Sequence, residues 1–154
     1  GSHCEVKHRM VAAVLGLVGF LISLYLWLWK VGLLGALVCG DGGCEVVQLS
    51  EYAELLGIPV AFFGMLAYLV LLALSLLGLQ PRWQERREPT VGLVLVAAVG
   101  VVYSAYLTYL EAAVIHAWCR WCVASAVIIA SILVAAVLGL RAMGRPAATR
   151  GTAA

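Results

Sequence analysis

Residues 119–140 read CRWCVASAVIIASILVAAVLGL, a cysteine pair followed by a long uncharged apolar run. A run of about 20 such residues is long enough to cross roughly 30 Å of hydrocarbon as an α-helix. Comparable runs occupy residues 10–29, 58–79 and 91–110. Because they are continuous rather than alternating, helices satisfy their backbone polar groups better than barrel strands would. The sequence predicts an all-α integral membrane protein, a bundle of four transmembrane helices.

The composition agrees with a protein that resides in a bilayer. Hydrophobic residues make up 64% of the 154 residues and charged residues 12%, which excludes an ordinary soluble domain. One membrane domain, residues 10–140, uses most of the chain. We expect residues 1–9 to combine an expression-tag remnant with a cytoplasmic N-terminus, and residues 141–154 to form a disordered cytoplasmic tail.

The positions of the cations predict the orientation of the bundle. Of ten Lys and Arg residues, only Lys30 and Arg120 lie outside the two termini and the stretch 80–90. The positive-inside rule then places both termini and residues 80–90 in the cytoplasm, and residues 30–57 and 111–118 on the outer side. We expect a bacterial inner membrane with an oxidising outer compartment. The basic residues are accounted for by this topology, so no nucleic-acid partner is expected.

The first outer segment contains one cysteine pair. Cys39 and Cys44 flank Gly-Asp-Gly-Gly, which can form the tight turn that brings two sulfurs to bonding distance. An exchangeable disulfide and a plain structural clip both fit this spacing. Residues 45–57 carry a polar side chain at every third position from 45 to 54 among mostly apolar ones, an amphipathic pattern that predicts a short helix on the outer surface.

The second cysteine pair opens the last span. Cys119 and Cys122 are three residues apart at a helix N-terminus, where backbone N–H groups and the helix dipole stabilise a thiolate. Cys122 lies one turn deeper, so we expect Cys119 to meet a loop cysteine. Zinc is not expected, because a second C-x-x-C is missing and His8 and His116 are predicted on opposite sides of the membrane. Cys4 lies in the tag region and is set aside.

Several spaced motifs, in this order, resemble the vitamin K epoxide reductase (VKOR) family. They are the loop cysteine pair, Ser50 six residues later, GIPVAFFG at 57–64, and YLTYLE at 106–111 followed by IHAW at 115–118 and the C-x-x-C. The resemblance covers about residues 10–140. It implies a bacterial homologue that oxidises a thioredoxin-like (DsbA-like) protein and reduces a membrane quinone of the menaquinone, ubiquinone or vitamin K type.

Carried onto this sequence, the resemblance implies an electron relay through four cysteines. Cys39 takes the partner's thiol, Cys44 relays to Cys119, and Cys122 delivers the electron pair to the quinone. No thioredoxin-like domain follows the last span in this sequence, so the partner is expected to be a separate protein or a domain that this sequence does not include.

The resemblance also implies a quinone site beneath the cysteines. We expect its ring and tail to be bound by Ser50, Val60, Phe63, Glu111 and Ala126. The alternative is an ordinary cap or turn hydroxyl for Ser50 and plain helix packing for Val60, Phe63 and Ala126. Glu111 could buffer protons or orient the site, or could simply be exposed at a helix end. Ala126 stands where vertebrate members carry a tyrosine, so the resemblance does not decide whether epoxide is reduced, and quinone reduction is the expected reaction.

Three other functions compete with this one. A second quinone-linked oxidase family of bacteria has a similar bundle but the two cysteine pairs in reverse order. A soft-metal transporter of the mercury type would use paired cysteines as thiolate ligands. A structural four-helix protein with two inert disulfides is the third alternative.

Overall fold

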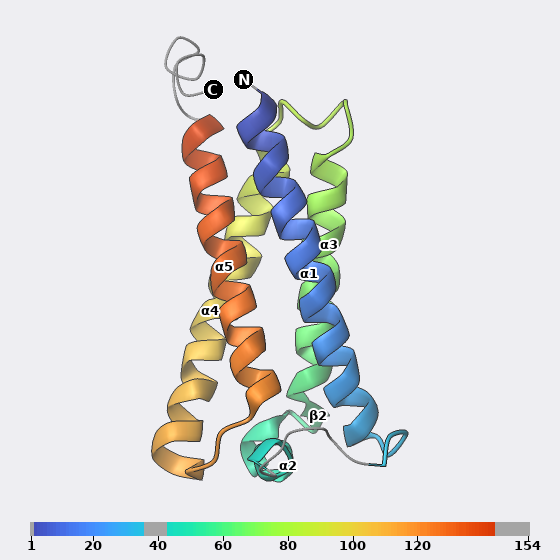
Figure 1. The fold of residues 1–154 in the computed structure, drawn as a ribbon, viewed down its shortest axis with the longest axis vertical. Helices are drawn as coiled ribbons and strands as arrows, with labels where there is room; N and C mark the ends of the chain where they lie inside the picture. Colours follow the sequence, from blue (N-terminus) through green and yellow to red (C-terminus); the bar gives the residue numbers. More distant parts are fainter. Residues whose placement is uncertain (1, 36–42, 144–154) are drawn as a thin grey trace.

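The protein is described by a computed structural model that covers residues 2–35 and 43–143, with side chains from Val6 onward. Four long helices form a bundle (Figure 1): α1 (Ser2–Lys30), α3 (Val60–Gly78), α4 (Glu88–Leu110) and α5 (Arg120–Met143). Within the described residues, all four segments are long and apolar enough to cross a membrane. The predicted class of fold is therefore confirmed.

Helices α1, α4 and α5 extend three to eight residues beyond their apolar runs, because polar residues at the membrane surface can continue a helix, whereas α3 lies within its run of 58–79. α1 begins eight residues before the predicted run, and α5 continues three residues past it. α4 begins at Glu88 with Pro89 in its first turn, where a missing N–H costs nothing. We call the end of the bundle where α1 ends and α5 begins the cysteine end, and the opposite one the basic end.

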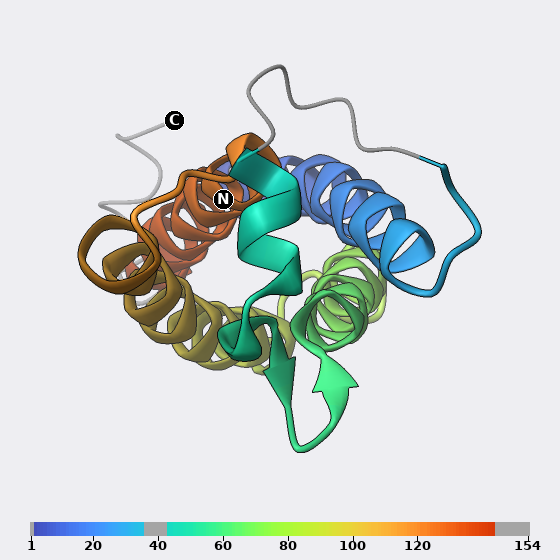
Figure 2. The ribbon, with the colours of Figure 1, turned by 90° about the horizontal axis from the view of Figure 1, so that it is seen from below.

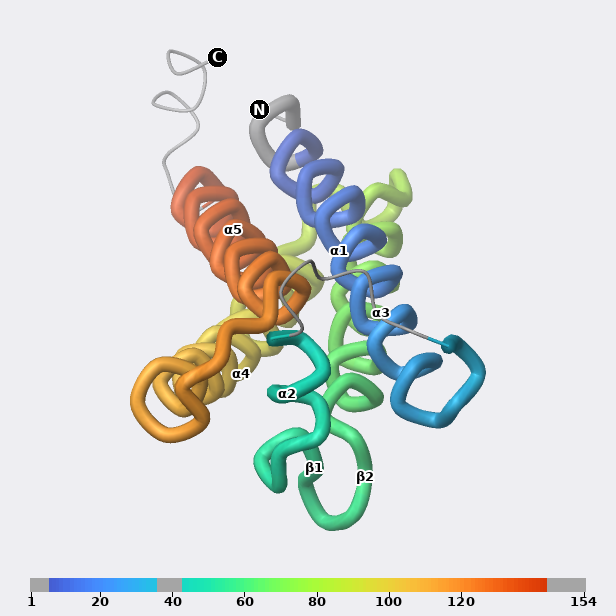
Figure 3. Tube along the Cα trace, turned by 60° about the horizontal axis from the view of Figure 1, so that its bottom comes forward, coloured from blue at the N-terminus to red at the C-terminus, as the bar shows by residue number. Residues whose placement is uncertain are grey.

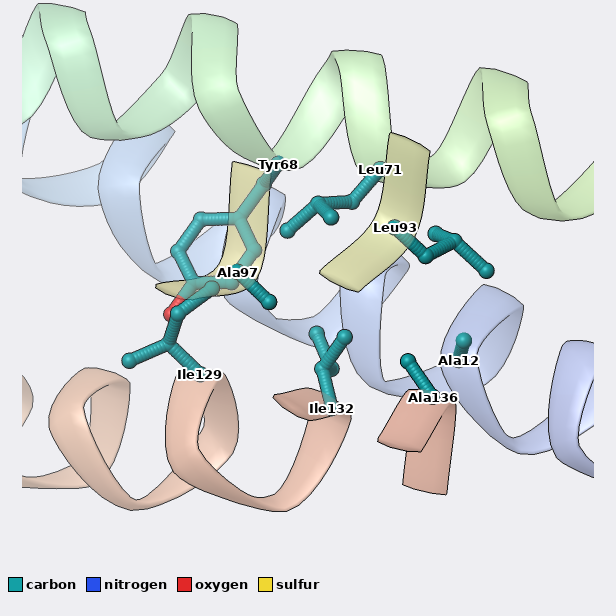
Figure 4. Packing of buried hydrophobic residues seen from close by; sticks show 8 residues of the cluster. All are labelled: Ala12, Tyr68, Leu71, Leu93, Ala97, Ile129, Ile132 and Ala136. Atoms are coloured by element: carbon teal, nitrogen blue, oxygen red, sulfur yellow. The ribbon is translucent and has the colours of Figure 1, made fainter. Parts of the chain in front are cut away.

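The core of the bundle is built from small and branched side chains of all four long helices (Figure 4). Its buried members are Ala12, Tyr68, Leu71, Leu93, Ala97, Ile129, Ile132 and Ala136. Gly19 lets α1 approach α3 closely, since a β-carbon there would lie 2.3 Å from the Tyr68 ring. Close approach at small residues is the usual way that helices pack in lipid, where burial from water gives no driving force.

Arg9 joins the elements of the basic end and is fully buried. Its guanidinium donates hydrogen bonds to the backbone carbonyls of Gly78, Trp83, Gln84 and Arg86 at 2.7, 3.3, 3.0 and 2.7 Å. It also donates to Thr90 Oγ1 at 3.2 Å, and the ring of His8 bonds to the same hydroxyl at 3.0 Å. These bonds satisfy the carbonyl of the last residue of α3 and carbonyls in the connection between α3 and α4.

The cysteine end is covered by the segment between α1 and α3. Helix α2 (Gly43–Leu49) crosses the end of the ring of four helices (Figure 2), and a short hairpin follows it on the same side (Figure 3). The predicted short helix is present, but its bounds of 45–57 were wrong. It ends at Leu49, and a 3-10 turn (Glu51–Ala53) and the strands β1 (Glu54–Leu55) and β2 (Ile58–Pro59) occupy the rest.

Two local features explain the early end of α2. Ser50 has an extended backbone (φ −69°, ψ 157°), and its hydroxyl donates to Val47 O at 2.7 Å instead of continuing the helix. Leu56 and Gly57 both have positive φ, at 57° and 80°. This is the conformation of a two-residue hairpin turn that twists with its strands.

The stretch predicted to lie on the outer side, residues 111–118, is partly helical. α4 continues into a π-helical turn (Glu111–Ile115) that ends at His116 in the left-handed conformation (φ 57°, ψ 36°). Residues 116–119 then lead into α5. π-helical turns within longer helices frequently occur at functional sites.

Candidate redox site

Cys119 occupies the N-cap position of α5. The helix begins at Arg120, and the N–H of Cys122, its third residue, donates to Cys119 Sγ at 3.2 Å. The N–H of Val123 donates to Cys119 O at 2.9 Å, the first bond of the helix. A cysteine sulfur therefore satisfies one of the N–H groups that every helix start leaves unpaired.

This position lowers the pKa of the Cys119 thiol. The largest cause is a hydrogen bond from the Cys122 thiol, and the backbone N–H of Cys122 acts in the same sense. Burial of Cys119 and the nearby Glu111 carboxyl oppose the shift without reversing it. Both cysteines are free thiols, so Cys119 is the sulfur more readily present as the thiolate that attacks disulfides.

Cys44 lies on α2 in the same apolar cluster as this pair. Its side chain is fully buried in an apolar cluster that also contains Cys119, Val47 and Leu26. Cys44 takes part in a disulfide. Cys39, the expected partner, lies outside the described residues. The structure thus brings together three of the four cysteines singled out in the sequence, on elements that are far apart along the chain.

Gln48 contacts the sulfur of Cys122, and the sequence analysis did not identify this glutamine as a site residue. It is only 6% exposed, and its Nε2 donates to Cys122 Sγ at 3.2 Å. The backbone carbonyl of Gln48 accepts a hydrogen bond from Lys30 at the end of α1, and Lys30 also pairs with Glu54 at 3.7 Å. The only signal in the sequence was its spacing, one helical turn after Cys44.

A cavity of about 580 Å³ lies beneath these groups, within the usual size of a small-molecule site. Its walls are mainly apolar side chains of α3, α4 and α5, with Cys122, Gln48 and Ser50 among the residues at its cysteine end. The sulfur of Cys122 is therefore the one that a molecule in the cavity meets, since Cys119 is fully buried and does not line it.

Four of the five residues expected to bind quinone line this cavity: Ser50, Val60, Phe63 and Glu111. Ala126, among the described residues, is not part of its lining. On α5 the lining residues follow Cys122 at Ser125 and Ile129, a spacing that keeps them on one helix face, and Ala126 is turned about 100° from Ser125.

Glu111 is a carboxyl group held inside the membrane domain. It is 3% exposed, lines the cavity, and its Oε2 accepts a hydrogen bond from the N–H of Cys119 at 3.5 Å. The π-helical turn begins at Glu111, and Ala117 N–H donates to its backbone carbonyl at 3.2 Å. An ionisable group in such a place is costly and is a strong candidate for function.

Within residues 2–35 and 43–143, no three His, Cys, Asp or Glu side chains are grouped as a metal site would require.

The family model described as "Vitamin K epoxide reductase family" matches residues 10–137, which is most of the chain. That family is associated with thiol–disulfide chemistry, quinone and thioredoxin-like partners, and the match gives no support to a metal transporter. The chain therefore belongs to the vitamin K epoxide reductase family, as a multi-pass membrane protein with the general quinone-linked oxidoreductase chemistry of that family.

Proposed function

We propose that this protein oxidises a separate thioredoxin-like (DsbA-like) protein and transfers the electrons to a membrane quinone, thereby supporting disulfide formation. The cysteine end would face the outer side of a bacterial inner membrane, with both termini in the cytoplasm. One observation carries the proposal. A disulfide-bonded Cys44 packs with the free thiol Cys119, while the neighbouring free thiol Cys122 faces an apolar cavity.

The outer exchange would use Cys39 and Cys44. A thiolate of the partner attacks Cys39, Cys44 leaves as a thiolate, and the partner's second thiol then displaces Cys39, so the partner leaves with a disulfide. Exchange is fastest when the attacking sulfur is a thiolate and the leaving sulfur has a low pKa.

The relay to the inner pair follows by the same chemistry. Cys44 attacks Cys119 of a Cys119–Cys122 disulfide, and Cys122 leaves as a thiolate. Cys39 then attacks Cys44, which restores the outer disulfide and releases Cys119. The end state, with Cys44 in a disulfide and two free inner thiols, is the state in which the structure describes these three cysteines.

The cavity fits a quinone by its size and by its lining of many apolar and few polar groups. A bound quinone supplies the acceptor for two electrons and two protons. We propose that Val60 and Phe63 flank the ring and that the hydroxyl of Ser50, which donates to Val47 O and still has lone pairs, supports its polar edge.

The second proton requires a further group. When Cys119 is a thiolate and Cys122 a thiol, closing their disulfide releases two electrons but only one proton. Glu111 is the only carboxylic acid among the described residues that line the cavity. A carboxyl buried from water is costly to ionise, so Glu111 can hold a proton at rest and supply it here.

The test follows quinone absorbance after a reduced thioredoxin-like protein is added to the purified protein in detergent. We expect turnover with the wild type and none with Cys122→Ala. Cys39→Ala should block electrons from the protein partner while sparing those from the small thiol dithiothreitol. Absence of quinone reduction by wild type with either donor would refute the proposal.

A further inference from the structure

Gln48 is a buried amide that the relay of cysteines does not use. It lies on α2 one turn after Cys44, so both side chains face the bundle, at 6% and 0% exposure. Its amide donates to Cys122 Sγ at 3.2 Å. Packing alone does not explain a glutamine at this position, because an apolar side chain of equal size would fill the space without burying polar atoms.

The two inner sulfurs have different hydrogen-bond donors. Cys119 accepts from a backbone N–H at the start of α5, which every residue at position 122 would supply. Cys122 accepts from the side chain of Gln48, on a different element. Lys30 at the end of α1 donates to the backbone carbonyl of Gln48 and so anchors the backbone from which this side chain extends.

We propose that Gln48 is a positioning residue for the quinone step: its amide holds the Cys122 sulfur toward the cavity and stabilises this sulfur whenever it carries negative charge. The inference rests on the proposed function. Such charge arises twice, when Cys44 displaces Cys122 from Cys119 and when the Cys122 thiol has given up its proton before electron transfer. An N–H donor to a thiolate is a hydrogen bond to a charged acceptor, about twice as strong as a neutral one.

Gln48 also links the two cysteine pairs mechanically. Cys44 and Gln48 share a helix of seven residues. A shift of α2 that moves Cys44 relative to Cys119 therefore moves the amide relative to Cys122 as well. The contact with Cys122 is present with Cys44 in a disulfide and the inner thiols free, the state ready to reduce quinone.

The experiment separates the two half-reactions in full-length protein in detergent. Protein reduced with dithiothreitol and freed of it is mixed with a short-tailed quinone, and a single turnover is followed by quinone absorbance between neutral and alkaline pH. Outer exchange is measured as the rate at which oxidised protein, without quinone, consumes its first equivalent of a dithiol, before the inner pair is reduced. The variants are Gln48→Met and Gln48→Glu, and Gln84→Met at the basic end is the matched control.

Loss of a hydrogen bond to a charged group corresponds to about tenfold to a hundredfold in rate. We expect Gln48→Met to slow the quinone step by that factor relative to wild type at neutral pH. At alkaline pH, where the thiolate forms without help, the ratio of the two rates should approach one, since Glu111 affects both rates equally. Gln48→Glu, which has the same shape, should be at least as slow. Reaction of the outer disulfide with the dithiol and the rates of Gln84→Met should stay within about twofold of wild type.

Three results would overturn the inference: an unchanged quinone step in both variants, an equal loss in both half-reactions, or a loss that does not depend on pH. The last two indicate a purely structural role. If Gln48→Met does not fold, Gln48→Glu gives the same comparison. Failure of the wild type to reduce quinone would instead refute the proposed function itself, so the two failures are distinguishable.

Discussion

Replacement of Glu111 by glutamine tests how the site handles protons. The side chain keeps its size, and the amide oxygen can still accept the hydrogen bond that Cys119 N–H donates to Oε2 at 3.5 Å. The start of α5 should therefore stay in place. What is lost is the proton that a buried carboxyl can supply to the cavity.

The size of the effect follows from that loss alone. A positioned general acid contributes about 10²- to 10⁴-fold to a rate. The hydrogen bond from Cys119 N–H, which the glutamine keeps, contributes about 1 kcal/mol at most, because its length of 3.5 Å is at the long limit of a hydrogen bond. We therefore expect Glu111→Gln to slow quinone reduction at least a hundredfold and to leave the free energy of unfolding nearly unchanged.

The assay is a single turnover of the reduced protein with quinone across a range of pH. The wild-type rate should fall as pH rises and Glu111 loses its proton, and Glu111→Gln should lack that fall. Glu88→Gln, at the exposed start of the same helix, is the matched control and should behave as wild type. A Glu111→Gln rate within threefold of wild type at every pH would show that the acid lies elsewhere.

Three further predictions concern single positions. Arg9→Met should lower the free energy of unfolding, measured in a denaturation series, by about 3 kcal/mol or more, because several buried carbonyls lose their donor. Arg82→Met, at an exposed site, is the control and should change that free energy little. Gly19→Ala should lower the free energy of unfolding by about 1–3 kcal/mol and reduce quinone turnover, because the added β-carbon would overlap the ring of Tyr68, which lines the cavity. Equal melting temperatures of the variant and the wild type would contradict this prediction. Cys122→Ala removes the main cause of the lowered pKa of Cys119, so the pH profile of Cys119 alkylation by iodoacetamide should move to higher pH, and an unmoved profile would remove the assigned cause.

The bilayer makes much of this fold readable from sequence. Apolar runs such as 119–140 had to become helices, since backbone groups in lipid have no water to bond, and their ends differ from the observed ones by only a few residues at α3 and α5. The segment 45–57 was harder. Outside the membrane the competition between helix, 3-10 turn and hairpin is decided by single residues, here Ser50 and the Leu56-Gly57 turn.

The sequence by itself determined the four spans and the cysteine spacing, because both depend on contiguous residues and on the local geometry of one helix. The sequence also predicted that Cys122 is the deeper sulfur of its pair, and Cys122 lines the cavity. Only the tertiary structure decided that Gln48 reaches Cys122 and that Glu111 lies beside Cys119. Those relations depend on the rotation of each helix about its own axis and on how α2 crosses the end of the bundle. Packing among several helices sets both, and no single stretch of the chain encodes that packing.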